Sequence, residues 1–176
     1  RLHFGKLPET GTIEFWFKPN FNMLNGMPAI GMGAVPIYIN TNWSDNYRRI
    51  YIGIHPTGGF GGVFGSANGV AGIWVLDTTT DWSTGDLVHI ALVWDRNRFS
   101  GGKTMAFFVN GVMTSSITNV MVFADPVTFD VVDVGNISYS HDRPAMGTID
   151  NLKIYSFAKT DFSDRFTEGG GSLPPP

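Results

Sequence analysis

Residues 82–111 decide the fold; they read WSTGDLVHIALVWDRNRFSGGKTMAFFVNG. The stretch holds two apolar runs, His89–Trp94 and Thr104–Val109, whose β-branched and aromatic residues are typical of β-strands. A polar segment with glycines, residues 95–103, separates the runs, which predicts that they pair as an antiparallel hairpin. Both runs are almost wholly apolar. We therefore expect both faces of the hairpin to contact other parts of the protein, as in the middle of a two-sheet sandwich.

A tight turn is predicted directly after the second run, at Asn110-Gly111, because both residue types tolerate positive φ. The remaining sequence contains further short runs that are bounded by turn residues. We predict strands at Leu2–Lys6, Thr12–Lys18, Val35–Asn40, Arg49–His55, Ile73–Asp77, Val112–Ile117, Asn119–Phe123, Val127–Val134, Gly135–Tyr139 and Gly147–Ser156. The glycine-rich segment Pro56–Gly72 is predicted as a loop, and Phe157–Phe166 as a short helical turn. So many short strands favour a β-sandwich or barrel.

The composition excludes several classes of protein. The net charge is −3 and the basic residues are scattered, so we expect no nucleic-acid partner, which requires clustered positive charge. The sequence contains no cysteine, which excludes disulfides and thiolate metal sites. No stretch approaches the roughly 18 apolar residues of a membrane-spanning helix, so we expect no membrane insertion.

The end of the chain has the composition of a linker. Residues 169–176 read GGGSLPPP, a flexible Gly/Ser unit that runs into a stiff proline unit. We therefore predict one domain at residues 1–166 and a linker or tail at 167–176, as part of a longer protein. A remnant of protein engineering is the alternative interpretation of the tail.

Three stretches carry a resemblance to a known family: Gly11–Pro19 (GTIEFWFKP), residues 82–111, and Gly135-Asn136 leading to Gly147–Ser156 (GTIDNLKIYS). In this order and spacing they resemble the laminin-G-like and pentraxin-like jelly roll of the concanavalin A-like lectin/glucanase superfamily. The resemblance implies an all-β fold, a two-sheet antiparallel jelly-roll sandwich. The sequence departs from the family at Val88, where a Trp often precedes the His of the central strand.

Some relatives in this superfamily are glycoside hydrolases, which place two carboxylates across a concave sheet. The laminarinase type carries a Glu-x-Asp-x-x-Glu strand, whereas this chain has only Glu9, Glu14 and Glu168, none of them in that pattern. The four histidines also lack the spacing of a zinc site. We therefore expect no enzymatic activity, and an atypical glycoside hydrolase is the third-ranked hypothesis.

Sugar binding relies on exposed aromatic rings with amides and carboxylates close by. A tryptophan in a polar loop is hard to place in a core, so the loop around Trp43 is the best candidate for a ligand site. The predicted contacts in this loop are Asn42, Trp43, Asp45, Asn46 and Tyr47. Trp74 and Trp82, which flank a Thr-rich turn, are further candidates. The alternative is that Trp43 caps the end of the sandwich or contacts a neighbouring subunit.

Calcium is the metal that the resemblance implies. Many members of the superfamily hold a structural Ca²⁺ through an Asp of the last strand and backbone carbonyls near the N-terminus, and Asp150 stands at the matching place. Calcium takes six to eight oxygen ligands, so one carboxylate does not establish the site. Asp150 satisfying nearby turn amides is the equal alternative.

The leading hypothesis is a non-catalytic extracellular recognition module that binds carbohydrate or mediates adhesion within a larger surface or secreted protein. Its partner is then a glycan. The second hypothesis is a structural or assembly domain on a filament, virion or cell envelope, whose partner is a neighbouring protein subunit. Both place the domain outside the cell or on a cell or virion surface.

Overall fold

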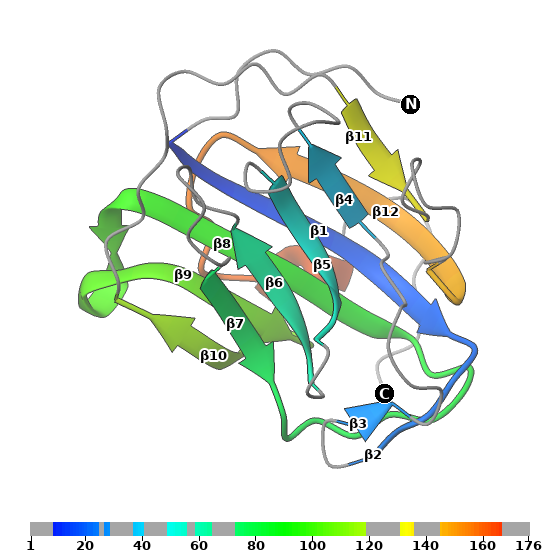
Figure 1. Ribbon diagram of the computed structural model, residues 1–176. Helices are drawn as coiled ribbons and strands as arrows, with labels where there is room; N and C mark the ends of the chain where they lie inside the picture. Colours follow the sequence, from blue (N-terminus) through cyan, green and yellow to red (C-terminus); the bar gives the residue numbers. More distant parts are fainter. Residues whose placement is uncertain are drawn as a thin grey trace.

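The computed structural model describes residues 9–24, 27–28, 37–40, 49–55, 59–64, 73–118, 131–135 and 145–166. Two antiparallel sheets lie face to face (Figure 1), as the sequence predicts for a jelly-roll sandwich. The predicted strands Leu2–Lys6 and Asn119–Phe123 lie outside the described residues, and so does most of Gly135–Tyr139. Within the described parts, no helix is long and apolar enough to cross a membrane.

The back sheet has the strand order β10-β9-β8-β1-β12. Its strands are β1 (Thr10–Pro19), β8 (Val88–Phe99), β9 (Lys103–Val109), β10 (Val112–Ile117) and β12 (Gly147–Tyr155). The front sheet has the order β11-β4-β5-β6-β7. Its strands are β4 (Ile37–Asn40), β5 (Arg49–Ile54), β6 (Phe60–Phe64), β7 (Ile73–Asp77) and β11 (Val131–Val134). The minor elements are the ribbon β2 (Met23–Leu24) with β3 (Met27–Pro28), and the 3₁₀ turns η1 (Ser100–Gly102) and η2 (Ser163–Phe166).

The predicted hairpin is β8 and β9, at the middle of the back sheet. The turn at Asn110-Gly111 is confirmed, with φ of 52° and 81° at its two residues. The connection is shorter than predicted, because β8 continues to Phe99. Residues 96–98 of β8 are polar and exposed, so this end of the strand has no apolar pattern by which the sequence could reveal it.

Strand β6 corrects the prediction that Pro56–Gly72 is entirely a loop. Its sequence is FGGVF, and glycine is normally unfavourable in a strand. Packing explains one of these glycines, because a Cβ at Gly62 would collide with the side chain of Leu92 on β8 in the opposite sheet. The glycine thus allows the two sheets to approach each other.

The core lies between the sheets and is rich in aromatic side chains. Alternate residues of β1 point into it, and Ile13, Phe15 and Phe17 are fully buried. The Phe17 ring stacks on Phe60 of β6, with centroids 6.1 Å apart and planes 14° from parallel. Trp94, the last residue of the apolar run His89–Trp94, is also fully buried.

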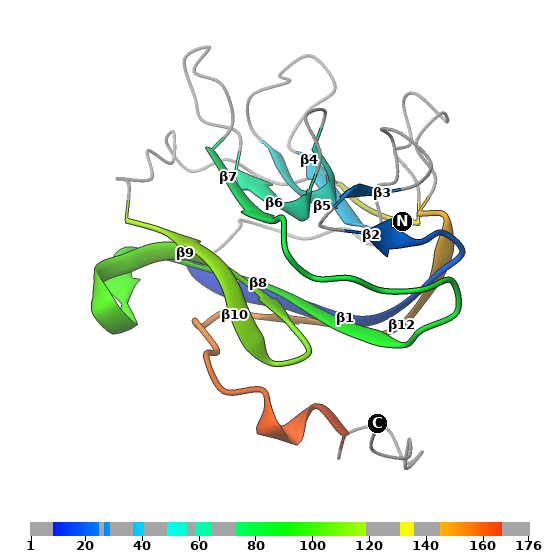
Figure 2. The ribbon, with the colours of Figure 1, turned by 90° about the horizontal axis from the view of Figure 1, so that it is seen from below.

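A C-terminal strap, residues 156–166, covers the outer face of the back sheet (Figure 2). The Phe162 ring is buried there, with centroids 5.4 Å from His89 and 4.9 Å from Phe108. Ala91, Val93 and Ala106 complete this second apolar layer. Both faces of the central hairpin therefore contact protein, as predicted from their apolar sequences.

Candidate functional site

The outer face of the front sheet carries a row of large side chains. Tyr51, Val63 and Trp74 are Cα partners across β5, β6 and β7. Their strand neighbours, such as Ile50, Ile52 and Val75, are buried in the core between the sheets. Because side chains alternate along a strand, the row faces away from the core. In the described part of the chain, no helix or strand lies over this face.

An aromatic cluster forms around Trp74 on this face. The Tyr51 ring lies edge-on to Trp74, with centroids 4.8 Å apart and planes at 85°. The His55 ring lies 4.6 Å from Trp74, also at 85°. Edge-to-face contacts of this kind favour a fixed ring orientation. Tyr51 and Val63 are buried, whereas Trp74 and His55 stay partly exposed, so only part of the Trp74 indole is accessible to solvent.

The same row continues through the remaining two strands of the sheet. Tyr38 of β4 is the register partner of Tyr51, and Asp133 of β11 is the partner of Tyr38. The adjacent row on β4 and β5 pairs Asn40 with Arg49. The backbone therefore gathers aromatic, amide and charged residue types at neighbouring positions of one sheet.

The predicted loop residues Asn42, Trp43, Asp45, Asn46 and Tyr47 lie outside the described residues. Their loop leaves the front sheet at Asn40 and rejoins it at Arg49, and these two residues are register partners. The predicted loop and the aromatic cluster are thus attached to the same sheet.

The structure does not bring together Trp74 and Trp82, which the sequence grouped around one turn. Trp82 is only 5% exposed and packs in the core, with ring centroids 5.4 Å from Phe60 and 6.3 Å from Phe21. Sequence reasoning also did not identify Tyr51 and His55. The alternation in RIYIGIH carries the signal, because Ile50, Ile52 and Ile54 fix one face as core and leave the other for Arg49, Tyr51 and His55.

Asp150 lies exposed on β12, and its Oδ1 accepts a hydrogen bond of 2.8 Å from the backbone N–H of Asn151. This contact fits the interpretation that Asp150 satisfies a local turn. Among the described residues, no group of three or more His, Cys, Asp or Glu side chains is placed to hold a metal. Residues 1–8, where the resemblance implies carbonyl ligands, lie outside those residues, so calcium at Asp150 stays a prediction.

Glu14, the glutamate on the predicted strand Thr12–Lys18, is buried beneath the strap rather than placed in a cleft. Its Oε1 accepts hydrogen bonds from Tyr155 Oη at 2.9 Å and from Lys159 Nζ at 3.1 Å. Burial alone would raise the pKa of Glu14, but the contacts with His89, Tyr155 and Lys159 outweigh it and lower the pKa to about 2. A glycosidase acid needs a raised pKa, so this carboxylate is suited to holding the strap.

With the geometry described, the comparisons with known proteins place the chain in a family. The profile of the "Concanavalin A-like lectin/glucanases superfamily" matches residues 3–161, so the chain belongs to this superfamily. A comparison with curated proteins gave no match.

Several solved structures share the fold at low sequence identity. The CBM40 of the Ruminococcus gnavus IT-sialidase, bound to alpha2,3 sialyllactose, aligns with a TM-score of 0.64 at 15% identity, over 93% of this chain and 92% of that one. The heptameric SAP-like pentraxin from Limulus polyphemus aligns with a TM-score of 0.61 at 15% identity, over 90% of this chain and 70% of the pentraxin chain. The NanB sialidase of Streptococcus pneumoniae aligns with a TM-score of 0.64 at 17% identity, over 94% of this chain but only 24% of that protein. These likenesses show the fold.

Proposed function

We propose that this domain is a non-catalytic carbohydrate-binding module that binds its glycan on the outer face of the front sheet. The observation that carries the proposal is the aromatic cluster, in which Tyr51 and His55 hold the partly exposed indole of Trp74. A ring in this position offers an apolar platform for the C–H face of a sugar.

The residue types around the platform suit the hydroxyl groups of a sugar. Asn40, Arg49 and Asp133 occupy register positions next to Tyr38 and Tyr51. Residues 41–48 connect Asn40 to Arg49, and this segment contains Trp43 and Tyr47 with amide and carboxylate residues beside them in the sequence. Aromatic rings flanked by a few polar groups are typical of ligand sites.

The lectin-like fold supports this proposal, and so does the likeness to a CBM40 whose structure contains a sialylated sugar. We accordingly propose that this domain belongs to a secreted or surface-attached protein and works outside the cell.

A glycan-array screen of the domain with a Trp74→Ala variant tests the proposal. We expect the wild type to bind a defined set of glycans, and Trp74→Ala to weaken binding about tenfold, which corresponds to about 1.4 kcal/mol. Phe157→Ala is the matched control, since Phe157 is an exposed aromatic residue of the strap, 53% accessible, on the other side of the molecule. Trp43→Ala tests the contribution of the loop. Unchanged binding by a folded Trp74→Ala protein would contradict the proposed site.

A second candidate function, assembly through protein–protein contacts, is favoured by strand β10. It is an edge strand of the back sheet, and its Val112 and Met113 side chains are 65% and 42% exposed. An exposed apolar edge is a template for pairing with another strand. Light scattering separates the two functions, because assembly predicts an oligomer that Val112→Lys converts to monomer, whereas glycan binding requires no oligomer.

A further inference from the structure

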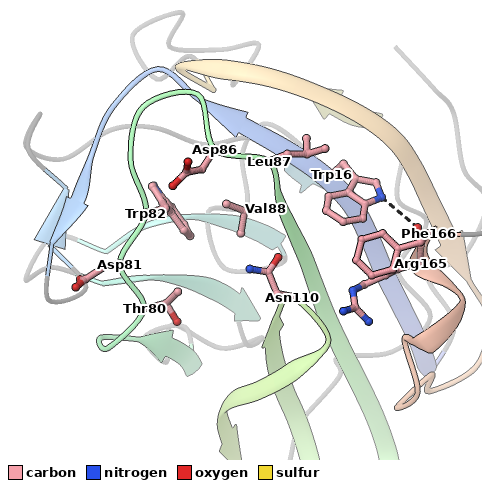
Figure 3. Close-up of a pocket in the computed structure, with 10 residues that line it drawn as sticks. All are labelled: Trp16, Thr80, Asp81, Trp82, Asp86, Leu87, Val88, Asn110, Arg165 and Phe166. Atoms are coloured by element: carbon pink, nitrogen blue, oxygen red, sulfur yellow. Dashed lines mark hydrogen bonds between the residues drawn. The ribbon is translucent and has the colours of Figure 1, made fainter. Parts of the chain in front are cut away.

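A second concave site lies at one end of the sandwich, away from the front-sheet face. It is a pocket of about 460 Å³ between the strap and the connection from β7 to β8 (Figure 3). Trp16 of β1, Arg165 and Phe166 of the strap form one wall, and Thr80, Asp81 and Asp86 of the connection lie on the other side. The volume falls within the range of sites for small molecules, about 300–1,000 Å³.

The guanidinium of Arg165 is the cation of this pocket. Its Nη1 donates a hydrogen bond of 2.9 Å to the carbonyl of Phe162, and its central carbon lies 4.3 Å from the centroid of the Phe166 ring. Its Nε is buried without a hydrogen-bond partner. In the described part of the structure, no carboxylate forms an ion pair with Arg165. A buried donor and an unpaired positive charge both favour an anionic ligand.

Nearby elements hold this arginine in place before any ligand arrives. Trp16 Nε1 donates a hydrogen bond of 3.3 Å to the backbone carbonyl of Arg165 (Figure 3). Gly111 lets the β9–β10 turn approach the guanidinium, because a Cβ there would lie 2.9 Å from Arg165 Nη1. A pre-positioned guanidinium loses little freedom when it binds a carboxylate, which favours affinity.

The other side of the pocket has the opposite character. Asp81 and Asp86 contribute carboxylates to this side, and Thr80 contributes a hydroxyl. Asp86 Oδ2 already accepts a hydrogen bond of 2.7 Å from the backbone N–H of Ser83. Leu87, Val88 and the ring of Trp16 give the pocket apolar surface between its two polar sides. A matching ligand therefore has a carboxylate at one end, hydrogen-bond donors at the other, and an apolar face between them.

We propose that this pocket binds a single acidic sugar residue. The sugar carboxylate pairs with Arg165, a hydroxyl group donates to Asp86, and its ring lies against Trp16 and Leu87. This site goes beyond the proposed function because it shares no residue with the aromatic cluster around Trp74, so either site can exist without the other.

Calorimetry on the whole chain with glucuronic acid and N-acetylneuraminic acid as probes, and glucose as the neutral control, tests the pocket. We expect the acids to bind with dissociation constants near the millimolar range and glucose at least tenfold more weakly. Arg165→Gln should remove this preference and Arg165→Lys should keep part of it. The matched control is Arg96→Gln, because Arg96 is an exposed arginine paired with Glu9 at 2.7 Å.

A second variant keeps the test independent of the fold of the strap. Leu87 is 39% exposed at the rim, so Leu87→Glu should leave the fold intact and repel the acidic probes. Trp74→Ala should leave binding of these acids unchanged, which separates this site from the front-sheet site. Three results would each overturn the proposal: no binding of either acid, equal binding of glucose, or tighter binding of a zwitterion such as glycine than of either acid.

Discussion

Lys159 donates a hydrogen bond of 3.1 Å to the buried carboxylate of Glu14, which joins the strap to β1 across 145 residues of sequence. The same ammonium lies 2.9 Å from Asp164 Oδ1, so one cation links two carboxylates. The Glu14 and Lys159 side chains are only 3% and 11% exposed. The strap is therefore attached through a buried ion pair as well as through the Phe162 ring.

Replacing Lys159 by methionine should destabilise the domain. The substitution keeps the apolar stem but leaves the Glu14 carboxylate buried without its main cation, and breaking a buried ion pair from one side costs about 3–5 kcal/mol. We expect the free energy of unfolding to fall by about 3 kcal/mol, measured by urea denaturation.

Lys153→Met is the comparison variant for this experiment, because it removes a cation that lies farther from Glu14 than Lys159 does. Lys153 Nζ lies 3.8 Å from Glu14 Oε1 and its side chain is 27% exposed, so its loss should cost clearly less. The double variant Glu14→Gln with Lys159→Met removes both charges and should recover part of the stability. Equal losses in Lys153→Met and Lys159→Met would contradict this account of the strap.

The stability of the domain should depend on pH through Glu14. The pKa of Glu14 is about 2 in the folded protein, against an ordinary value of 4.5. Between these two values the unfolded chain binds more protons, so the contribution of Glu14 is complete above pH 4.5 and is lost as the pH falls toward 2. The pKa of Lys159 is raised from its ordinary 10.5, so its contribution is complete below that pH and is lost as the pH rises through the folded value.

Urea denaturation at about pH 7 and about pH 3 measures how much the free energy of unfolding falls on acidification. We expect the wild type to lose more stability on acidification than Glu14→Gln, which lacks the titrating carboxyl. The same loss in both proteins would show that groups other than Glu14 cause the loss of stability at acidic pH.

The parts of the fold that the sequence predicted are those with a strong local pattern. Thr12–Lys18 alternates cleanly and became the core of β1, and the Asn110-Gly111 turn needed only two neighbouring residues to be recognised. Strand β6 was missed because it contains two glycines, and the one at position 62 is explained by a partner in the other sheet, Leu92. That partner is 30 positions away in the sequence, so no local pattern reports it.

The same distinction applies to the candidate sites. Trp74 could be selected by residue type, whereas its contacts with Tyr51 and His55 depend on the register of three strands. The pocket beside Arg165 depends on the docking of the strap onto β1, which is a relationship between the two ends of the chain. Glu14 was correctly assigned to a strand, but its ion pair with Lys159 could not be predicted from spacing.

Asn110 combines two roles that separate variants can distinguish. Its backbone adopts a φ of 52°. Its Oδ1 accepts a hydrogen bond of 2.9 Å from the backbone N–H of His89. Its own backbone N–H donates a hydrogen bond of 2.8 Å to the carbonyl of His89. Asn110→Ala loses the side-chain bond and strains the backbone, so thermal denaturation should show a loss of about 1–3 kcal/mol. Asn110→Gly keeps the backbone freedom and loses only the bond, so its loss should be smaller by about 1 kcal/mol. If Asn110→Gly is the less stable of the two, strain in the left-handed backbone does not control the stability of this turn.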